Sequence, residues 1–217
     1  MKTFTQSGVE YRPLTSAASP IAWQAEPKRT LRDCAQAHTG RLIDKWSHYF
    51  PIYQHHFAKF VGRPIQVLEI GVSHGGSLQL WKSYFGSKAQ VWGVDIDPRC
   101  TEYGEDQIYV MTGDQSDAKF WEHFNSMGNI WDVIIDDGSH IPDHQSTSFR
   151  ALWPLVKSGG IYLIEDCHNI YPGLIYEDRP LIYKYPWVLV AEKPKRMVIG
   201  KPSRPLNENE LQAYGPR

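Results

Sequence analysis

Residues 134–144 read IIDDGSHIPDH, so an apolar segment runs directly into aspartate, serine and histidine side chains. A buried strand needs only a glycine and one or two polar residues to end, because glycine supplies backbone freedom and Asp and Ser bond their own main chain. This segment carries more ionisable groups than such a turn requires. The excess favours a site in which these groups bind a ligand or react.

Three carboxylates that follow two apolar segments form the sharpest chemical signal. Asp137 comes just after residues 131–135, and Glu165 and Asp166 come directly after residues 161–164. If these segments are adjacent parallel strands, their tips lie about 4.8 Å apart and the carboxylates converge. Clustered like charges repel unless a cation lies among them. A hard divalent ion, Mg²⁺ before Mn²⁺ or Ca²⁺, suits such oxygen ligands. The alternative is that the carboxylates pair with arginines or cap helices.

The ends of the first three expected strands carry residues suited to a nucleoside ligand. Residues 69–77 (EIGVSHGGS) form a glycine-containing loop that opens a helix and lets a ligand approach the backbone. Ser73 stands where the dinucleotide fingerprint has its second glycine, which weighs against a nicotinamide cofactor. Asp95 can accept both hydroxyls of a ribose, although a lone aspartate there is more commonly a cap or turn former. The candidate cofactor-binding residues are Glu69, Gly71, Ser77, Asp95, Asp114, Gln115 and Asp136.

Short apolar segments alternate with amphipathic segments through the middle of the chain. This alternation predicts parallel strands linked by helices, and therefore a doubly wound α/β sheet. Residues 187–192 and 196–199 flank a Lys-Pro-Lys turn and predict an antiparallel hairpin at the sheet edge. The expected strands are 66–70, 90–94, 107–111, 131–135 and 161–164, and the expected helices are 77–85, 116–127 and 142–156.

The first sixty residues differ from the rest of the chain. Residues 1–28 have no sustained period and predict an extended arm. Residues 30–60 have helical spacing, with a break expected at Pro51. We therefore divide the chain into an N-terminal arm and helical cap segment, residues 1–60, and an α/β part, residues 61–217, which together make one compact domain.

Composition excludes several classes of protein. A formal net charge of −1 over 217 residues gives no electrostatic case for nucleic acid or an anionic membrane as partner. No apolar segment is long enough to span a membrane, and the first residues lack a signal-peptide core. Three scattered cysteines suit neither a disulfide framework nor a zinc site. We expect a cytoplasmic protein, and a homo-oligomer in which the aromatic N-terminal helices form the interface.

Several motifs together resemble one enzyme family. The segments LEIGVSHGGSLQLW, VWGVDIDP and WDVIIDDGSHIPDHQ, followed by GGIYLIEDCHNIY, are similar to class I S-adenosylmethionine-dependent methyltransferases. Within that class they resemble the metal-dependent sugar O-methyltransferases of the macrolide mycinose-pathway type. The resemblance covers about residues 38–172, and the pairing of DDGSH with IED at this spacing is its most specific part.

The resemblance implies a fold, ligands and roles. The fold would be a Rossmann-like sheet of seven strands, mostly parallel, with a C-terminal antiparallel hairpin, so that residues 61–217 form the methyltransferase domain. By position, Asp95 matches the ribose-binding acid, Gly71 the cofactor loop and His140 the catalytic base. The residues that match the family's Mg²⁺ ligands are Asp137, Glu165 and Asp166.

The function implied is Mg²⁺-dependent transfer of a methyl group from S-adenosylmethionine to a hydroxyl of a saccharide. The acceptor is an antibiotic sugar or a polysaccharide precursor, and residues 171–187, rich in tyrosine, are either an acceptor wall or core. Three alternatives stay open at this point. A cephalosporin hydroxylase family has a similar acidic pattern, the α/β alternation also suits an NAD(P)-dependent oxidoreductase, and the many aromatic residues suit a saccharide-binding protein.

Overall fold

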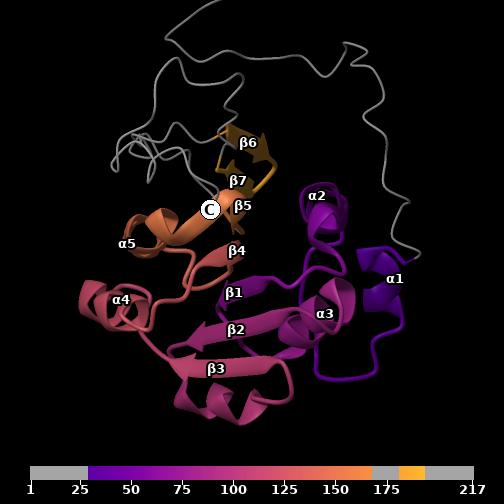
Figure 1. Cartoon of the computed structure of the whole chain (residues 1–217), viewed down its shortest axis with the longest axis horizontal. Coiled ribbons are helices and arrows are strands. Elements are labelled where there is room, and N and C mark those ends of the chain that lie inside the picture. The colour runs from indigo at the N-terminus through magenta and orange to yellow at the C-terminus, as the bar shows by residue number, and fades with distance from the viewer. Residues whose placement is uncertain (1–28, 168–180, 194–217) are drawn as a thin grey trace, which may run out of the picture.

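A single seven-stranded sheet organises the protein (Figure 1). The structure, a computed structural model, describes residues 29–167 and 181–193. The strand order is β3-β2-β1-β4-β5-β7-β6, with β1 to β5 parallel and β7 and β6 antiparallel. This confirms the Rossmann-like sheet with a C-terminal hairpin. The strands are β1 Gln66–Ile70, β2 Gln90–Asp95, β3 Ile108–Thr112, β4 Trp131–Asp136, β5 Val156–Ile164, β6 Leu181–Tyr185 and β7 Val188–Glu192.

Helices cover both faces of the sheet, because consecutive apolar strand residues point to opposite sides (Figure 1). In β4, Val133 and Ile135 belong to the same core cluster as residues of α1, α2 and α3, whereas Ile134 belongs to the cluster that includes residues of α4 and α5. All three side chains are fully buried. The helices are α1 Leu31–Gln36, α2 Tyr49–Phe57, α3 Gly76–Phe85, α4 Ala118–Asn125 and α5 Pro142–Leu152, with shorter 3₁₀ segments at Ala58–Phe60, Pro98–Tyr103 and Trp153–Leu155.

The order of the strands reverses between β1 and β4. From β1 the chain builds outward through β2 to β3, and it then returns to place β4 on the other side of β1. The carboxyl ends of the five parallel strands therefore meet along one edge of the sheet. Ligands of doubly wound folds bind at this point, because the two crossovers leave a crevice there.

The hairpin pairs different segments from those that the sequence predicts. β7 Val188–Glu192 is one of the expected strands, but its partner is β6, which precedes it. The other expected strand, residues 196–199, lies outside the described residues. The prediction placed the hairpin turn at the Lys-Pro-Lys sequence, because that sequence is typical of turns. The observed turn is instead formed by residues 186 and 187.

The segment before α2 is wrongly predicted as helix. Residues 37–46 carry no helix, and Leu42 and Trp46, whose helical spacing contributed to that prediction, are 62% and 54% exposed. Pro51 does not break a helix, since it lies in the first turn of α2, where its missing N–H costs nothing. The non-helical segment is what allows Lys45 to reach the strand ends described below.

Two element ends also differ from the sequence pattern. The helix expected over residues 116–127 is shorter, α4 Ala118–Asn125, and its cap is Asp117, whose side chain accepts from the Lys119 amide. The helix expected over residues 142–156 ends at Leu152, and the strand expected over 161–164 begins earlier, so Ser158, Gly159 and Gly160 lie within β5. Because serine and glycine are typical of turns, the sequence did not predict that β5 begins before these three residues.

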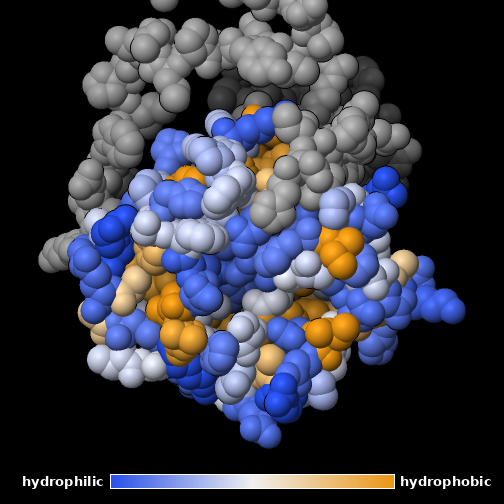
Figure 2. Space-filling model, turned by 180° about the vertical axis from the view of Figure 1, so that it is seen from behind, coloured by the Kyte–Doolittle hydropathy of each residue, from blue (hydrophilic) through white to orange (hydrophobic). Residues whose placement is uncertain are grey.

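The surface agrees with the composition of the chain. Figure 2 shows one face on which separate hydrophobic patches lie among hydrophilic residues. Within the described ranges, no helix combines the length and apolar character that a membrane span requires.

Candidate active site

An open pocket lies at the carboxyl ends of β1, β2 and β3, beside the reversal in strand order. Ile70, Val94 and Ile96 supply its apolar wall. Such a wall with a few polar groups is the usual composition of a cofactor site. Four of the seven predicted cofactor-binding residues line it, namely Gly71, Asp95, Asp114 and Gln115.

Asp95 at the end of β2 holds the loop that follows β1. Its Oδ2 accepts the backbone amides of Val72 (2.7 Å) and Ser73 (3.0 Å), and its Oδ1 accepts the amide of Asp97 (2.9 Å). Each carboxylate oxygen has more than one lone pair, so hydroxyl donors can still approach from the pocket. Asp95 therefore fixes the loop and borders the pocket at the same time.

Gly71 allows the tips of β1 and β4 to approach closely. Its φ is +90°, and a Cβ built there would lie 2.1 Å from the backbone oxygen of Asp137. Any side chain at this position would collide with the β4 tip, so the glycine is required by both conformation and space. The close approach also places Gly138 and Ser139, which follow β4, in the wall of the pocket.

Asp136 is not part of the pocket wall, although the sequence grouped it with the cofactor residues. It is fully buried and accepts from Gln115 (2.7 Å), Ser148 (2.8 Å) and Tyr162 (3.1 Å). Burial raises its pKa to about 6, and these hydrogen bonds act in the opposite direction. Through Gln115, whose side-chain oxygen accepts the Ser139 amide at 3.0 Å, Asp136 positions a residue that does line the pocket.

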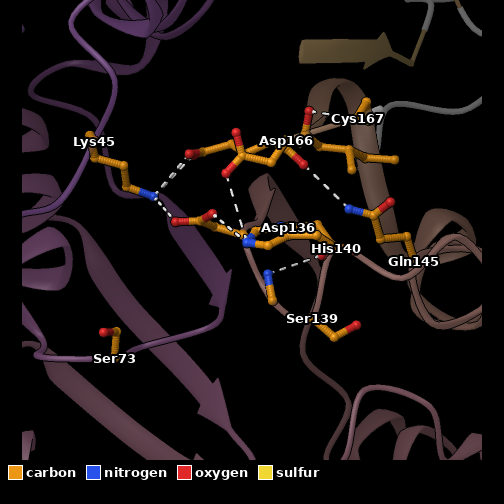
Figure 3. A network of polar contacts seen from close by, with 12 residues as sticks. Lys45, Ser73, Asp136, Ser139, His140, Gln145, Asp166 and Cys167 are labelled. Atoms are coloured by element: carbon orange, nitrogen blue, oxygen red, sulfur yellow. Dashed lines mark hydrogen bonds and ion pairs between the residues drawn. The ribbon is translucent and has the colours of Figure 1, made fainter. Parts of the chain in front are cut away.

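Lys45 supplies a buried cation at the ends of β1, β4 and β5, and sequence reasoning missed it. Its ammonium lies 2.5 Å from Asp137, 3.1 Å from Glu165 and 3.2 Å from Glu69, and its side chain is 2% exposed. In Figure 3 the Lys45 side chain points from the N-terminal segment into the strand ends, where dashed lines join its ammonium to acidic side chains. The repulsion among the carboxylates is therefore relieved in part by this lysine.

The charge of Lys45 is maintained by its acidic neighbours. Burial alone would lower the pKa of its ammonium, but the carboxylates of Glu165, Asp137 and Glu69 raise it well above the ordinary value. Burial also raises the pKa values of Glu165 and Glu69, and Lys45 acts to lower both. Glu69 and Ser77, which the sequence assigned to the cofactor, belong to this buried group, since Ser77 donates to Glu69 at 2.7 Å.

Asp137, His140 and Asp166 form a second group on the side of the acidic cluster that is open to solvent. One ligand atom from each lies within 4.8 Å of the others. The Nε2 of His140 is 3.9 Å from Asp137 Oδ1 and 3.8 Å from Asp166 Oδ2. Two carboxylates and an imidazole at these separations are a donor set that accommodates a divalent cation.

Glu165 differs from these three residues in its burial and in its contact with Lys45. Both oxygens of Glu165 face Lys45, at 3.1 Å and 3.2 Å, and its side chain is 1% exposed. Asp137 contacts Lys45 through Oδ2 and His140 through Oδ1, so it joins the two groups. The structure thus brings all four predicted metal and base residues to one place, with Glu165 the most deeply buried.

Tyr49 orients Asp166 and was also missed by sequence reasoning. Its buried hydroxyl donates to Asp166 Oδ1 at 2.5 Å. Burial and the Asp166 carboxylate raise the pKa of this phenol, which therefore stays a donor. Asp166 and His140 both have positive φ, +50° and +58°, a conformation that Asp and His adopt more readily than most residues. Left-handed residues at an active-site edge re-aim side chains toward a common point.

The site fits both an adenosyl cofactor and a metal ion in its chemistry. The Nδ1 of His140 is buried and has no hydrogen-bond partner within the described part of the chain, so the ring is not committed to another structural contact. The signal for Lys45 and Tyr49 was the sequence KWSHY, which lies within the region of family resemblance but was read only as an aromatic helix.

Comparisons with known proteins agree on one family. The family described as Rhamnosyl O-methyltransferase/CmcI matches residues 36–187. A tetracenomycin rhamnosyl 3'-O-methyltransferase from Streptomyces olivaceus is 43% identical over 150 residues, which cover 62% of this chain and 38% of that protein. The mycinamicin VI 2''-O-methyltransferase from Micromonospora griseorubida is 42% identical over 135 residues, which cover 58% of this chain and 33% of that protein.

Solved structures give the same answer for the fold. The MycE methyltransferase from the mycinamycin biosynthetic pathway, in complex with Mg and SAH, is 31% identical with a TM-score of 0.68, over 82% of this chain and 58% of that chain. Its complex with Mg, SAH and mycinamycin VI gives 32% identity and a TM-score of 0.64, over 75% and 54%. The chain thus spans less than two thirds of the length of these relatives.

Proposed function

Because the chain belongs to the Rhamnosyl O-methyltransferase/CmcI family, we propose that it methylates a hydroxyl of a sugar, with S-adenosylmethionine as methyl donor. The acceptor would be a glycosylated small molecule or a polysaccharide precursor. The observation that carries this proposal is the group of Asp137, His140 and Asp166 beside the pocket at the β1, β2 and β3 ends. Relatives named as rhamnosyl and mycinamicin O-methyltransferases support the choice of a sugar hydroxyl.

The pocket residues would bind and orient the methyl donor. Asp95 would accept the ribose hydroxyls, and the backbone around Gly71 would allow close approach of the amino-acid part. Asp114 and Gln115 border the end of the pocket over β3, where a base can lie. The apolar side chains of Ile70, Val94 and Ile96 would exclude water from that surface.

The carboxylates at the β4 and β5 ends would hold a divalent cation. Asp137 and Asp166 would be two of its ligands, since their carboxylates lie close to each other and to His140. Glu165 would be the third carboxylate ligand, and the cation would compete with Lys45 for it. A bound Mg²⁺ would lower the pKa of an acceptor hydroxyl and fix its oxygen for attack. Tyr49 would hold Asp166 in the required rotamer.

His140 would accept the proton of the acceptor hydroxyl. Its Nε2 lies on the side of the acidic group that is open to solvent, and the histidine side chain is 36% exposed. Imidazole is the side chain that most often acts as a general base in enzymes. Asp137 and Asp166, each within 4 Å of Nε2, would stabilise the imidazolium that results.

Methyl transfer to glycosides tests the proposal directly. With S-adenosylmethionine and Mg²⁺ present, mass spectrometry of candidate glycosides should show a gain of one methyl group. EDTA should abolish this gain, and added Mg²⁺ should restore it. A lack of effect of chelation would contradict the metal assignment.

His140→Ala separates a base from a metal ligand. As a base, His140 should be dispensable for binding of SAH and Mn²⁺, measured by calorimetry, while turnover falls by about 10²–10⁴-fold. His123→Ala, on the exposed surface of α4, is the matched control and should keep turnover. Loss of Mn²⁺ binding in His140→Ala would instead make His140 a ligand.

A further inference from the structure

Three exposed aromatic rings lie together beside the acidic group and outside the hydrophobic core. Trp46 and His48 come from the segment before α2, and Trp187 comes from the turn between β6 and β7. Trp46 and Trp187 are 54% and 48% exposed. Their ring centroids are 5.8 Å apart with the planes inclined at 66°, and the His48 and Trp187 rings are 6.0 Å apart at 69°. We call these three residues the aromatic platform.

The aromatic platform borders Asp166 through two separate connections. On one side, the His48 ring meets Tyr49 at 4.5 Å, and the Tyr49 hydroxyl donates to Asp166 Oδ1. On the other side, the amide of Cys167, the residue after Asp166, donates to the backbone oxygen of Trp187 at 2.9 Å. The platform therefore continues the surface from which an acceptor would reach the acidic group.

Trp187 is the second residue of the two-residue turn between β6 and β7, and such tight turns commonly require a positive φ. Its φ is +61°, a region that bulky residues rarely adopt. Tyr183 and Tyr185, in the strand just before it, pack against the core, whereas Trp187 points to the exposed side. The turn therefore explains the backbone, and the observation that bears on binding is a large, 48% exposed indole at this position beside the acidic group.

We propose that the aromatic platform is a saccharide subsite that binds the C–H face of one sugar ring of the acceptor, which rests on the methyl-transfer function proposed above. A pyranose has an apolar face of C–H groups and a polar edge of hydroxyls. Two inclined indole rings offer apolar surface to the first, and the Trp46 indole and the His48 imidazole can donate to the second.

The size and position of the platform favour a sugar over a second protein chain. A stable protein interface buries roughly 800 Å² on each partner, more than three rings can supply. Polar and charged side chains of the acidic group border the platform, which suits a ligand that is itself amphipathic. A single ring stacked on the platform would bring its neighbouring hydroxyls toward Asp166.

Calorimetric titration with methyl α-L-rhamnopyranoside, in the presence of SAH and Mg²⁺, tests the platform without turnover. The full chain should bind this glycoside saturably and should not bind sorbitol, which has no ring face. Trp46→Ala and Trp187→Asn should each weaken binding by about ten-fold, since a stacked ring contributes on the order of one decade. Asparagine is chosen because it tolerates the left-handed backbone of Trp187.

Tyr109→Ala is the matched control, since Tyr109 is an exposed aromatic residue on β3 at the other edge of the sheet. It should leave glycoside affinity within about two-fold of the wild type. SAH affinity should be the same in all three variants, because the platform lies outside the cofactor pocket. Equal weakening by Tyr109→Ala would overturn the proposal.

The outcomes separate this proposal from the function itself. If the wild type methylates a glycoside and the two tryptophan variants keep its KM, the platform is not a sugar subsite although the function stands. Absence of saturable glycoside binding by the wild type also overturns the subsite. If the variants change only the oligomeric state in light scattering, the platform is an interface between copies. Failure of the function appears separately, as absent SAH binding and absent methyl transfer.

Discussion

The two halves of the site at the sheet edge are held together in different ways. Over β1, β2 and β3, the candidate cofactor pocket is shaped by hydrogen bonds to backbone amides, between residues that are near each other in the sequence. An example is the contact of Asp95 with Val72, 23 residues away. Over β4 and β5, the acidic half is held by one ammonium whose partners Asp137 and Glu165 are 92 and 120 residues away.

This difference shows how each half obtains its stability. The cofactor half satisfies its polar groups with neutral donors, which cost little to bury once they are hydrogen-bonded. The acidic half buries several charges, and removing one partner leaves the others without compensation. We therefore expect the acidic half to be sensitive to loss of charge and the cofactor half to be sensitive to added volume.

Replacement of Lys45 should have the largest effect. Lys45→Met keeps the length of the side chain but leaves Glu69 and Glu165 buried without a cation, so the free energy of unfolding should fall by about 3–5 kcal/mol. Urea denaturation measures this change. The matched control is Lys59→Met, which removes a partly exposed pair with Glu192 and should cost less than about 1 kcal/mol. If both variants lost the same free energy of unfolding, the acidic half would not be especially sensitive to loss of charge.

Gly71→Ala should have the next largest effect, through volume and not charge. The added Cβ would lie 2.1 Å from the Asp137 backbone oxygen at a φ of +90°, so we expect a loss of about 3 kcal/mol and weaker SAH binding. Gly62→Ala is the control, because its φ is +75° but no described atom lies within 4 Å of its Cβ. It should cost about 1 kcal/mol. A Gly71→Ala variant as stable as the control would show that the strand tips can separate.

The pH dependence of stability should reveal Asp136, which lies between the halves. Its pKa is about 6 in the folded protein and 3.8 as an ordinary carboxyl, so the folded chain binds the proton more tightly. Its contribution to the free energy of unfolding is therefore greatest below pH 3.8 and decreases as pH rises to about 6, by less than about 3 kcal/mol.

Asp136→Asn should remove this decrease, which urea denaturation at a series of pH values measures. Above about pH 7.5 the stabilities of variant and wild type should run parallel, since Asp136 is then almost fully ionised in both folded and unfolded wild-type chains. An unchanged slope between pH 4 and pH 6 would contradict the assignment of that proton to Asp136.

The parts of the fold and site that could be predicted share a physical basis. The parallel strands were identified because each is a short apolar run followed by a polar end, a pattern that burial on both faces requires. The convergence of Asp137 and Asp166 followed from the adjacency of β4 and β5. The prediction of a helix around Lys45 was wrong. It followed the helical spacing of the apolar residues there, whereas in the structure this segment is non-helical and Lys45 makes tertiary contacts with the acidic residues.

The sequence by itself determined the sheet, its candidate ligand-binding edge and the acidic residues there, because these depend on local periodicity and on strand ends. Only the tertiary structure decided which cation the acids face, which candidate residues line the pocket and where Trp46 meets Trp187. The reason is that these contacts join segments far apart in the chain. Their pairing depends on distances in the fold, which residue type and spacing do not encode.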